Sequence, residues 1–94
     1  MLAETIPAPQ CLSFVKHIDG TTCFWAPDRT GTPAELNARG RSYARELQNF
    51  IVTYDNVIIY NSVARAMTCS GEYGPVEIGF CTQIGIYLAG IAPR

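Results

Sequence analysis

Charged residues and long hydrophobic runs are both scarce in this chain of 94 residues. Aspartate, glutamate, lysine and arginine make up only 16% of it, against roughly 25% in an average globular protein. Because hydrophobic residues reach 48%, the composition excludes intrinsic disorder and predicts a compact fold. A formal net charge of −1 offers no attraction to nucleic acids. The most apolar stretch, 76–91, is shorter than the roughly 20 residues of a membrane span, so we expect neither a nucleic-acid partner nor a membrane span.

Motifs with a known chemical mechanism are also missing. His17 is the single histidine, and no nucleophilic serine or cysteine is placed beside it by spacing. No glycine-rich phosphate loop occurs, and Asp19, Asp28 and Glu35 are explained by turns and a helix cap. The cysteines form no close C-x-x-C pairs, so no metal or other cofactor is expected. The absence of these motifs favours a protein that is not an enzyme and has no catalytic residues.

What the chain does contain is four cysteines: Cys11, Cys23, Cys69 and Cys81. An even number in so short a chain is typical of secreted domains that supplement a small core with disulfides. We therefore expect a secreted protein with two disulfides, and the three possible pairings stay open. The alternative is a cytosolic protein in which reduced cysteines pack as small hydrophobic groups.

The first part of the chain predicts a hairpin. Residues 1–10 contain two prolines and are expected to form an extended segment ahead of a single domain over 11–94. The apolar and β-branched runs 11–18 and 21–26 flank Asp19-Gly20, the dipeptide preferred by a type I′ turn. A two-residue turn pairs the end of one strand with the start of the next.

A helix is predicted after the hairpin. Thr32-Pro33-Ala34-Glu35 has the residues of a capping box, with proline at the first helical position. Apolar residues then recur at helical spacing through Asn49 and beyond. Gly40 lies within this pattern, which suggests that its missing side chain admits a close neighbour such as a strand.

Strands are predicted in the last part. We expect one continuous strand over 57–70, with a short helix capped by Ser62 as the alternative for its second half. Residues 76–88 alternate apolar and less apolar positions, which predicts a strand with Ile84 on its buried face and Glu77 on the opposite face. The order is then β-β-α-β-β, a disulfide-stabilised α+β fold with one helix on an antiparallel sheet of about four strands.

Two resemblances accompany this fold. An early strand with Cys23, a central helix and a closing strand over 81–87 resemble the small secreted cysteine-bridged proteins of fungi, including killer-toxin-like virulence effectors. This resemblance implies a non-enzymatic protein that binds a host or competitor-cell target. The segments 32–47 and 57–68 are similar to parts of the histidine phosphatase family, but that family's Arg-His-Gly signature is missing around His17.

Aromatic and arginine side chains supply the candidate contacts, because such residues dominate binding hot spots. Trp25, Arg41, Arg45 and Tyr73 are the predicted binding residues. The alternative places Trp25 and Tyr43 in the core and leaves the arginines solvated. Three functions stay open: a secreted effector that binds a protein or cell-surface target, a cytosolic interaction module with reduced cysteines, and a phosphatase-like hydrolase fragment.

Overall fold

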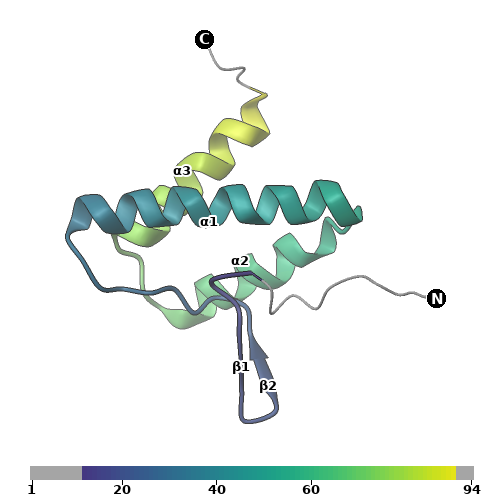
Figure 1. Ribbon diagram of the computed structural model, residues 1–94, viewed down its shortest axis with the longest axis horizontal. Coiled ribbons are helices and arrows are strands. Elements are labelled where there is room, and N and C mark those ends of the chain that lie inside the picture. The colour runs from purple at the N-terminus through teal and green to yellow at the C-terminus, as the bar shows by residue number, and fades with distance from the viewer. Residues whose placement is uncertain (1–11, 91–94) are drawn as a thin grey trace.

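Three helices and a short hairpin form the computed structural model, which describes residues 12–90 (Figure 1). Helix α1 runs across the centre with α2 below it, while α3 crosses α1 near one end. The hairpin projects away from the helices, and the predicted N-terminal segment 1–10 lies outside the described residues. The elements in chain order are β1 (Lys16–Ile18), β2 (Thr21–Cys23), α1 (Pro33–Tyr54), α2 (Ile58–Ser70) and α3 (Pro75–Ala89).

The hairpin is confirmed at its turn, although its strands are short. β1 and β2 pair antiparallel, with Ile18 opposite Thr21. Asp19 and Gly20 have φ angles of 51° and 75°, the left-handed values that a type I′ turn requires at both central positions. Each strand has three residues, so residues 12–15 and 24–26 of the predicted runs are irregular.

The start of α1 is also as predicted. The Thr32 hydroxyl accepts the Glu35 N–H at 3.2 Å, and the Glu35 carboxylate accepts the Thr32 N–H at 2.7 Å. This reciprocal pair satisfies two donors that the first turn of a helix leaves free. The helix ends at Asp55, whose left-handed backbone has φ 51°.

The prediction of strands over 57–70 and 76–88 is wrong, because both segments are helical. α2 begins at Ile58, so it also differs from the alternative helix capped by Ser62. α3 has proline in its first turn, and Glu77 accepts the Gly74 N–H at 2.9 Å. The four-stranded α+β fold is therefore replaced by three helices and a two-stranded sheet within the described residues. No helix among residues 12–90 is long and apolar enough to cross a membrane.

The prediction of disulfide stabilisation is wrong for the cysteines that the structure describes. Cys23, Cys69 and Cys81 are free thiols, whereas Cys11 lies outside the described residues. The Cys23 thiol lies 3.4 Å from the backbone oxygen of Trp25, and Cys81 lies on α3 beside Met67 of α2. The thiols therefore have separate neighbours, and packing rather than cross-linking holds the described elements together.

The backbones of α1 and α3 touch where the two helices cross. A Cβ atom on Gly40 would lie 2.0 Å from the Val76 oxygen, and one on Gly79 would lie 2.1 Å from the Asn37 oxygen. Real Cβ atoms do not approach other atoms so closely, so both glycines are required by this packing. Gly40 does admit a close neighbour, as expected, but the neighbour is a helix.

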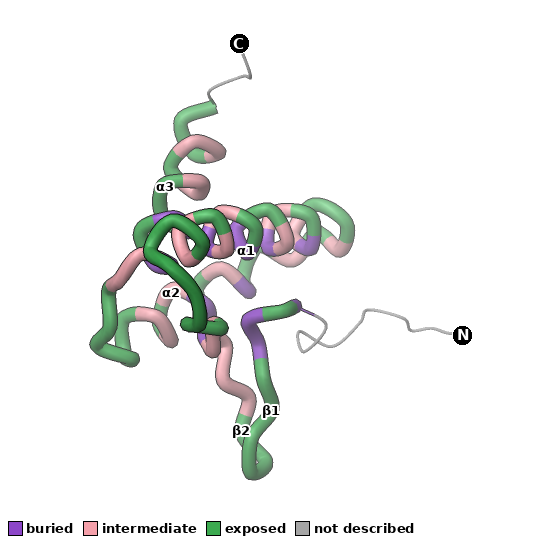
Figure 2. The backbone as a smooth tube through the Cα atoms, turned by 60° about the vertical axis from the view of Figure 1, so that its left-hand side comes forward, coloured by how far each residue is buried: buried purple, intermediate pink, exposed green. Residues whose placement is uncertain are grey.

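An aromatic cluster forms the centre of the core. The Trp25 ring lies 5.4 Å from Phe14 and 4.9 Å from Phe80, and Phe14 lies 5.2 Å from Tyr43. These distances are typical of favourable tilted and edge-to-face ring pairs. The cluster joins the hairpin flanks to α1 and α3, while the hairpin tip and residues 88–90 at the end of α3 are exposed (Figure 2). The buried hydrophobic residues are Leu12, Phe14, Val15, Trp25, Tyr43, Ala44, Leu47, Phe50, Ile59, Val63, Val76 and Phe80.

Candidate binding surface

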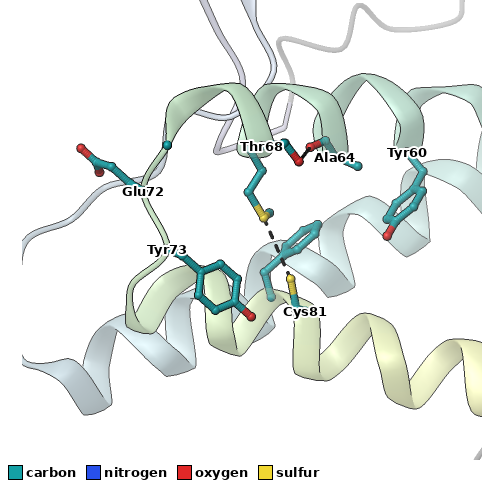
Figure 3. A pocket seen from close by; sticks show the side chains of 9 residues that line it. Tyr60, Ala64, Thr68, Glu72, Tyr73 and Cys81 are labelled. Carbon is teal, nitrogen blue, oxygen red and sulfur yellow. Dashed lines mark hydrogen bonds between the residues drawn. The ribbon is translucent and has the colours of Figure 1, made fainter.

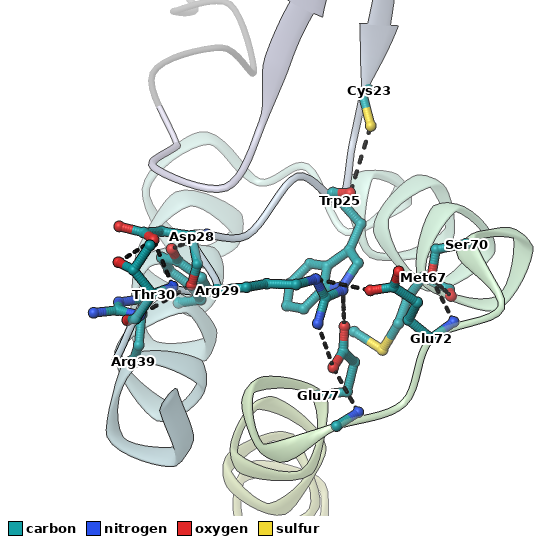
Figure 4. Close-up of polar contacts among 12 residues, drawn as sticks. Cys23, Trp25, Asp28, Arg29, Thr30, Arg39, Met67, Ser70, Glu72 and Glu77 are labelled. Carbon is teal, nitrogen blue, oxygen red and sulfur yellow. Dashed lines mark hydrogen bonds and ion pairs between the residues drawn. The ribbon is translucent and has the colours of Figure 1, made fainter. Parts of the chain in front are cut away.

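A buried carboxylate, Glu77, fixes the start of α3 to the segment that follows the hairpin (Figure 4). Its Oε2 atom accepts the Trp25 indole N–H at 2.9 Å, and its two oxygens accept the Arg29 guanidinium N–H groups at 3.2 and 2.5 Å. Arg29 also pairs with the exposed Glu72 at 2.9 Å. The Gly74 N–H also donates to this carboxylate. Both carboxylate oxygens therefore accept hydrogen bonds, and these bonds offset the cost of burying the negative charge.

The ionisation of Glu77 follows from these bonds. Burial alone raises the pKa of this carboxyl, but hydrogen bonds from Arg29, Trp25 and Gly74 outweigh burial and lower the pKa to about 2. Glu77 is therefore a fixed anion at neutral pH, which suits a structural role. The expectation that Glu77 lies on an outward face is wrong, because its side chain is fully buried.

Acid should weaken the fold through Glu77. A carboxyl whose pKa falls from 4.5 to about 2 on folding stabilises the folded state above pH 4.5 and loses that contribution as the pH falls through about 2. The shift corresponds to about 3 kcal/mol. We expect the stability difference between the wild type and Glu77→Gln to shrink over this window in urea titrations. A constant difference from pH 6 to pH 2 would contradict the lowered pKa.

A cleft of about 470 Å³ lies between α2 and α3 (Figure 3). Met67 and Cys81 meet across it with their sulfur atoms 4.0 Å apart, and Tyr73 stands at its edge with 66% of its surface exposed. The neighbouring Cys81 sulfur is the main cause that raises the pKa of Tyr73. The lining residues are Tyr60, Ala64, Met67, Thr68, Gly71, Glu72, Tyr73, Phe80 and Cys81.

The side of α3 that faces away from α1 is exposed and uncharged. We call it the outer face of α3. No Asp, Glu, Lys, Arg or His occurs between Ile78 and Gly90. Ile78 is 44% exposed and Leu88 is 79% exposed, so large apolar groups stand in solvent at both ends of this face. The outer face consists of Ile78, Cys81, Thr82, Gly85, Leu88 and Ala89, all exposed.

Two cavities border the outer face, one at Cys81 and one at Leu88. Cys81 also lines the cleft beside Tyr73, so the cleft and the outer face share an edge. Leu88 lines a second cavity of about 170 Å³, whose wall includes the exposed Val57. Contiguous exposed apolar surface of this kind marks interaction sites on soluble proteins.

The predicted binding residues do not gather in one place. Trp25 is buried in the aromatic cluster, as is Tyr43, so the core alternative holds for both residues. Arg41 donates to Asn37 at 3.2 Å and to Gln83 at 3.4 Å, and is half-buried. Arg45 is exposed on α1. Among the four predicted residues, only Tyr73 borders the apolar surface described above.

His17 has no neighbours that suit phosphatase chemistry. It lies on the exposed strand β1 with its Nδ1 atom 3.1 Å from the Thr22 hydroxyl oxygen. Within the described part of the chain, no arginine forms a hydrogen bond with it. Residues 12–90 also contain no group of three or more histidine, cysteine, aspartate or glutamate side chains that could hold a metal ion.

Sequence reasoning missed the outer face of α3, although a signal for it was present. The stretch from Ile78 to Gly90 lacks charge altogether, and a helix made of such residues has no polar side to turn to water. Comparison with known proteins adds no further guide, because no family model, curated protein or solved structure matches this chain.

Proposed function

We propose that this protein is a non-enzymatic interaction module that binds another protein through α3. The observation that carries this proposal is the outer face of α3, which remains exposed and uncharged although the opposite side of the same helix is already buried against α1. Interfaces are depleted in charged residues at their centres, and tyrosine is enriched in them. The outer face has no charge, and Tyr73 stands at its border.

Free thiols favour the interaction module with reduced cysteines over the secreted effector. Cys69 and Cys81 are exposed thiols, and exposed thiols persist in compartments that keep cysteines reduced. One feature of the resemblance to killer-toxin-like effectors was a closing strand over 81–87, and this segment is helical in the structure. The proposed interaction module therefore includes a reducing compartment as its location.

In-cell photocross-linking tests the proposed function. A benzophenone amino acid is introduced at Tyr73, and the matched control carries it at Val52, which is 72% exposed but lies on α1. We expect a cross-linked product with another protein chain, either a different protein or a second copy, from position 73 and none from position 52. The product should disappear when Ile78→Lys is added. Equal products from both positions, or a product that survives Ile78→Lys, would count against α3 as the binding surface.

A further inference from the structure

We propose that the outer face of α3 pairs with the same face of a second copy of this chain, the two helices running antiparallel. This inference deepens the proposed function, since it names one partner of the same surface. It rests on three properties of the face: its lack of charge, its spacing and its order of side-chain sizes.

The lack of charge removes the usual obstacle to self-association. Two identical surfaces carry the same charges, so charged residues on them can repel one another when the surfaces meet. The outer face carries none, because no acidic or basic residue occurs from Ile78 to Gly90. The whole chain has a formal net charge of −1, so long-range repulsion between two copies is also small.

The spacing of the exposed residues is that of a helix–helix seam. Ile78, Cys81, Gly85 and Leu88 follow one another at intervals of three or four residues, and the exposed Thr82 lies next to Cys81. This repeat keeps one side of a helix against a partner. The opposite side of α3 already uses such a seam against α1, with Gly79 at the crossing. A helix that is apolar on all sides is typical of one covered on all sides.

The order of side-chain sizes makes the face complementary to itself. At the four seam positions Ile78, Cys81, Gly85 and Leu88 the order is large, small, small, large, and it reads the same from the other end. An antiparallel pair therefore brings Ile78 beside the partner's Leu88 and Cys81 beside the partner's Gly85. A Cβ on Gly85 would meet nothing within 4 Å, so a second backbone has room to approach there. A two-fold interface requires this kind of self-complementarity, and antiparallel helix dipoles favour it.

The size of the face predicts a reversible dimer. The distance from Ile78 to Leu88 along the helix is about 15 Å, and stable interfaces bury about 800 Å² on each partner. The strip alone is smaller than that, although Tyr73 and Val57 extend it at its two ends. We therefore expect a dimer that dissociates on dilution.

Analytical ultracentrifugation of the full chain under reducing conditions tests the pairing. The wild type and Val52→Lys should show the same dissociation constant for the dimer, because Val52 is exposed on α1 and outside the face. Ile78→Lys and Leu88→Lys should each weaken the dimer by about tenfold or more, since each places a charge within an apolar seam. Both positions are exposed, and circular dichroism checks that the variants remain folded.

A charge-reversal variant tests the antiparallel arrangement. Ile78→Lys combined with Leu88→Glu places opposite charges at positions that meet only between antiparallel copies, because within one chain they are about 15 Å apart. We expect this double variant to form a tighter dimer than either Ile78→Lys or Leu88→Glu alone. A double variant weaker than both single variants would overturn the antiparallel pairing.

The failures of the two proposals can be distinguished. A wild type that stays monomeric at every concentration overturns self-pairing, as does a loss of dimer in Val52→Lys equal to that in Leu88→Lys. In either case the cross-link from position 73 to another protein still decides the proposed function. A concentration-dependent dimer that Leu88→Lys weakens supports self-pairing even if no other protein is cross-linked.

Discussion

Glu77→Lys is expected to unfold the protein. The change removes the acceptor of the Trp25 and Arg29 hydrogen bonds and places a second positive charge beside the Arg29 guanidinium in a buried position. Breaking a buried ion pair by removing one partner costs about 3–5 kcal/mol, a large part of the roughly 5–15 kcal/mol that stabilises a typical domain. Urea denaturation, followed through the emission of the single tryptophan, measures the effect.

Glu72→Lys is the matched control for this prediction. Glu72 contacts the same arginine, but its side chain is 62% exposed, so water screens the pair. Exposed ion pairs contribute about 1 kcal/mol or less. We therefore expect Glu72→Lys to remain folded with a small loss of stability. Similar unfolding curves for the two variants would show that Glu77 is not the buried anchor of α3.

Alanine at either glycine of the helix crossing is expected to destabilise the protein by about 3 kcal/mol or more. Helix propensity alone would favour alanine over glycine by about 1 kcal/mol. That gain is outweighed because the new methyl group of Gly40→Ala or Gly79→Ala would overlap a backbone atom of the other helix. Backbone atoms cannot swing aside as a flexible side chain can, so α1 and α3 must separate. Thermal and urea unfolding of each variant measures the loss.

Gly85→Ala is the control on the same helix. Nothing lies within 4 Å of the position its Cβ would take, so this change should raise stability by up to about 1 kcal/mol. The measurement is made in dilute protein, where pairing between copies contributes nothing. If Gly40→Ala and Gly79→Ala also raised stability, the close approach of α1 and α3 would be refuted.

Elements fixed by local chemistry could be predicted from the sequence. Asp19-Gly20 forms its turn, and Thr32 with Glu35 forms its cap, because both depend on atoms within a few residues. α3 could not be assigned in this way. Its segment is apolar at nearly every position, so it satisfies an alternating pattern and a helical one equally. The choice depends on the crossing of α1 and α3, where Gly40 lies against Val76 and Gly79 lies against Asn37, and this crossing joins distant parts of the chain.

The residues of the candidate surface also divide into those that could be predicted from residue type and those whose role depends on distant contacts. Tyr73 was identified from residue type alone and does border the apolar surface. The sequence could not decide whether Trp25 is a binding residue or a core residue, because its burial depends on Phe80 and Glu77 far along the chain. Arg29 was missed for the same reason: its partner Glu77 is 48 residues away. Residue type indicates what a side chain can bind, but only the fold decides whether it is already bound.

The hydrogen bond between Trp25 and Glu77 joins residues 52 positions apart, and this separation bears on how the chain is made. The hairpin and α1 are synthesised well before α3, so Phe14 and Trp25 leave the ribosome before Phe80 is available to pack against them. Long-range contacts of this kind form late, because the intervening chain must first be brought together. The sides of these rings that pack against Phe80 thus stay unshielded until α3 has been made. In a chain with so few charges to keep it dispersed, that interval is when chaperone binding and aggregation compete most strongly with folding.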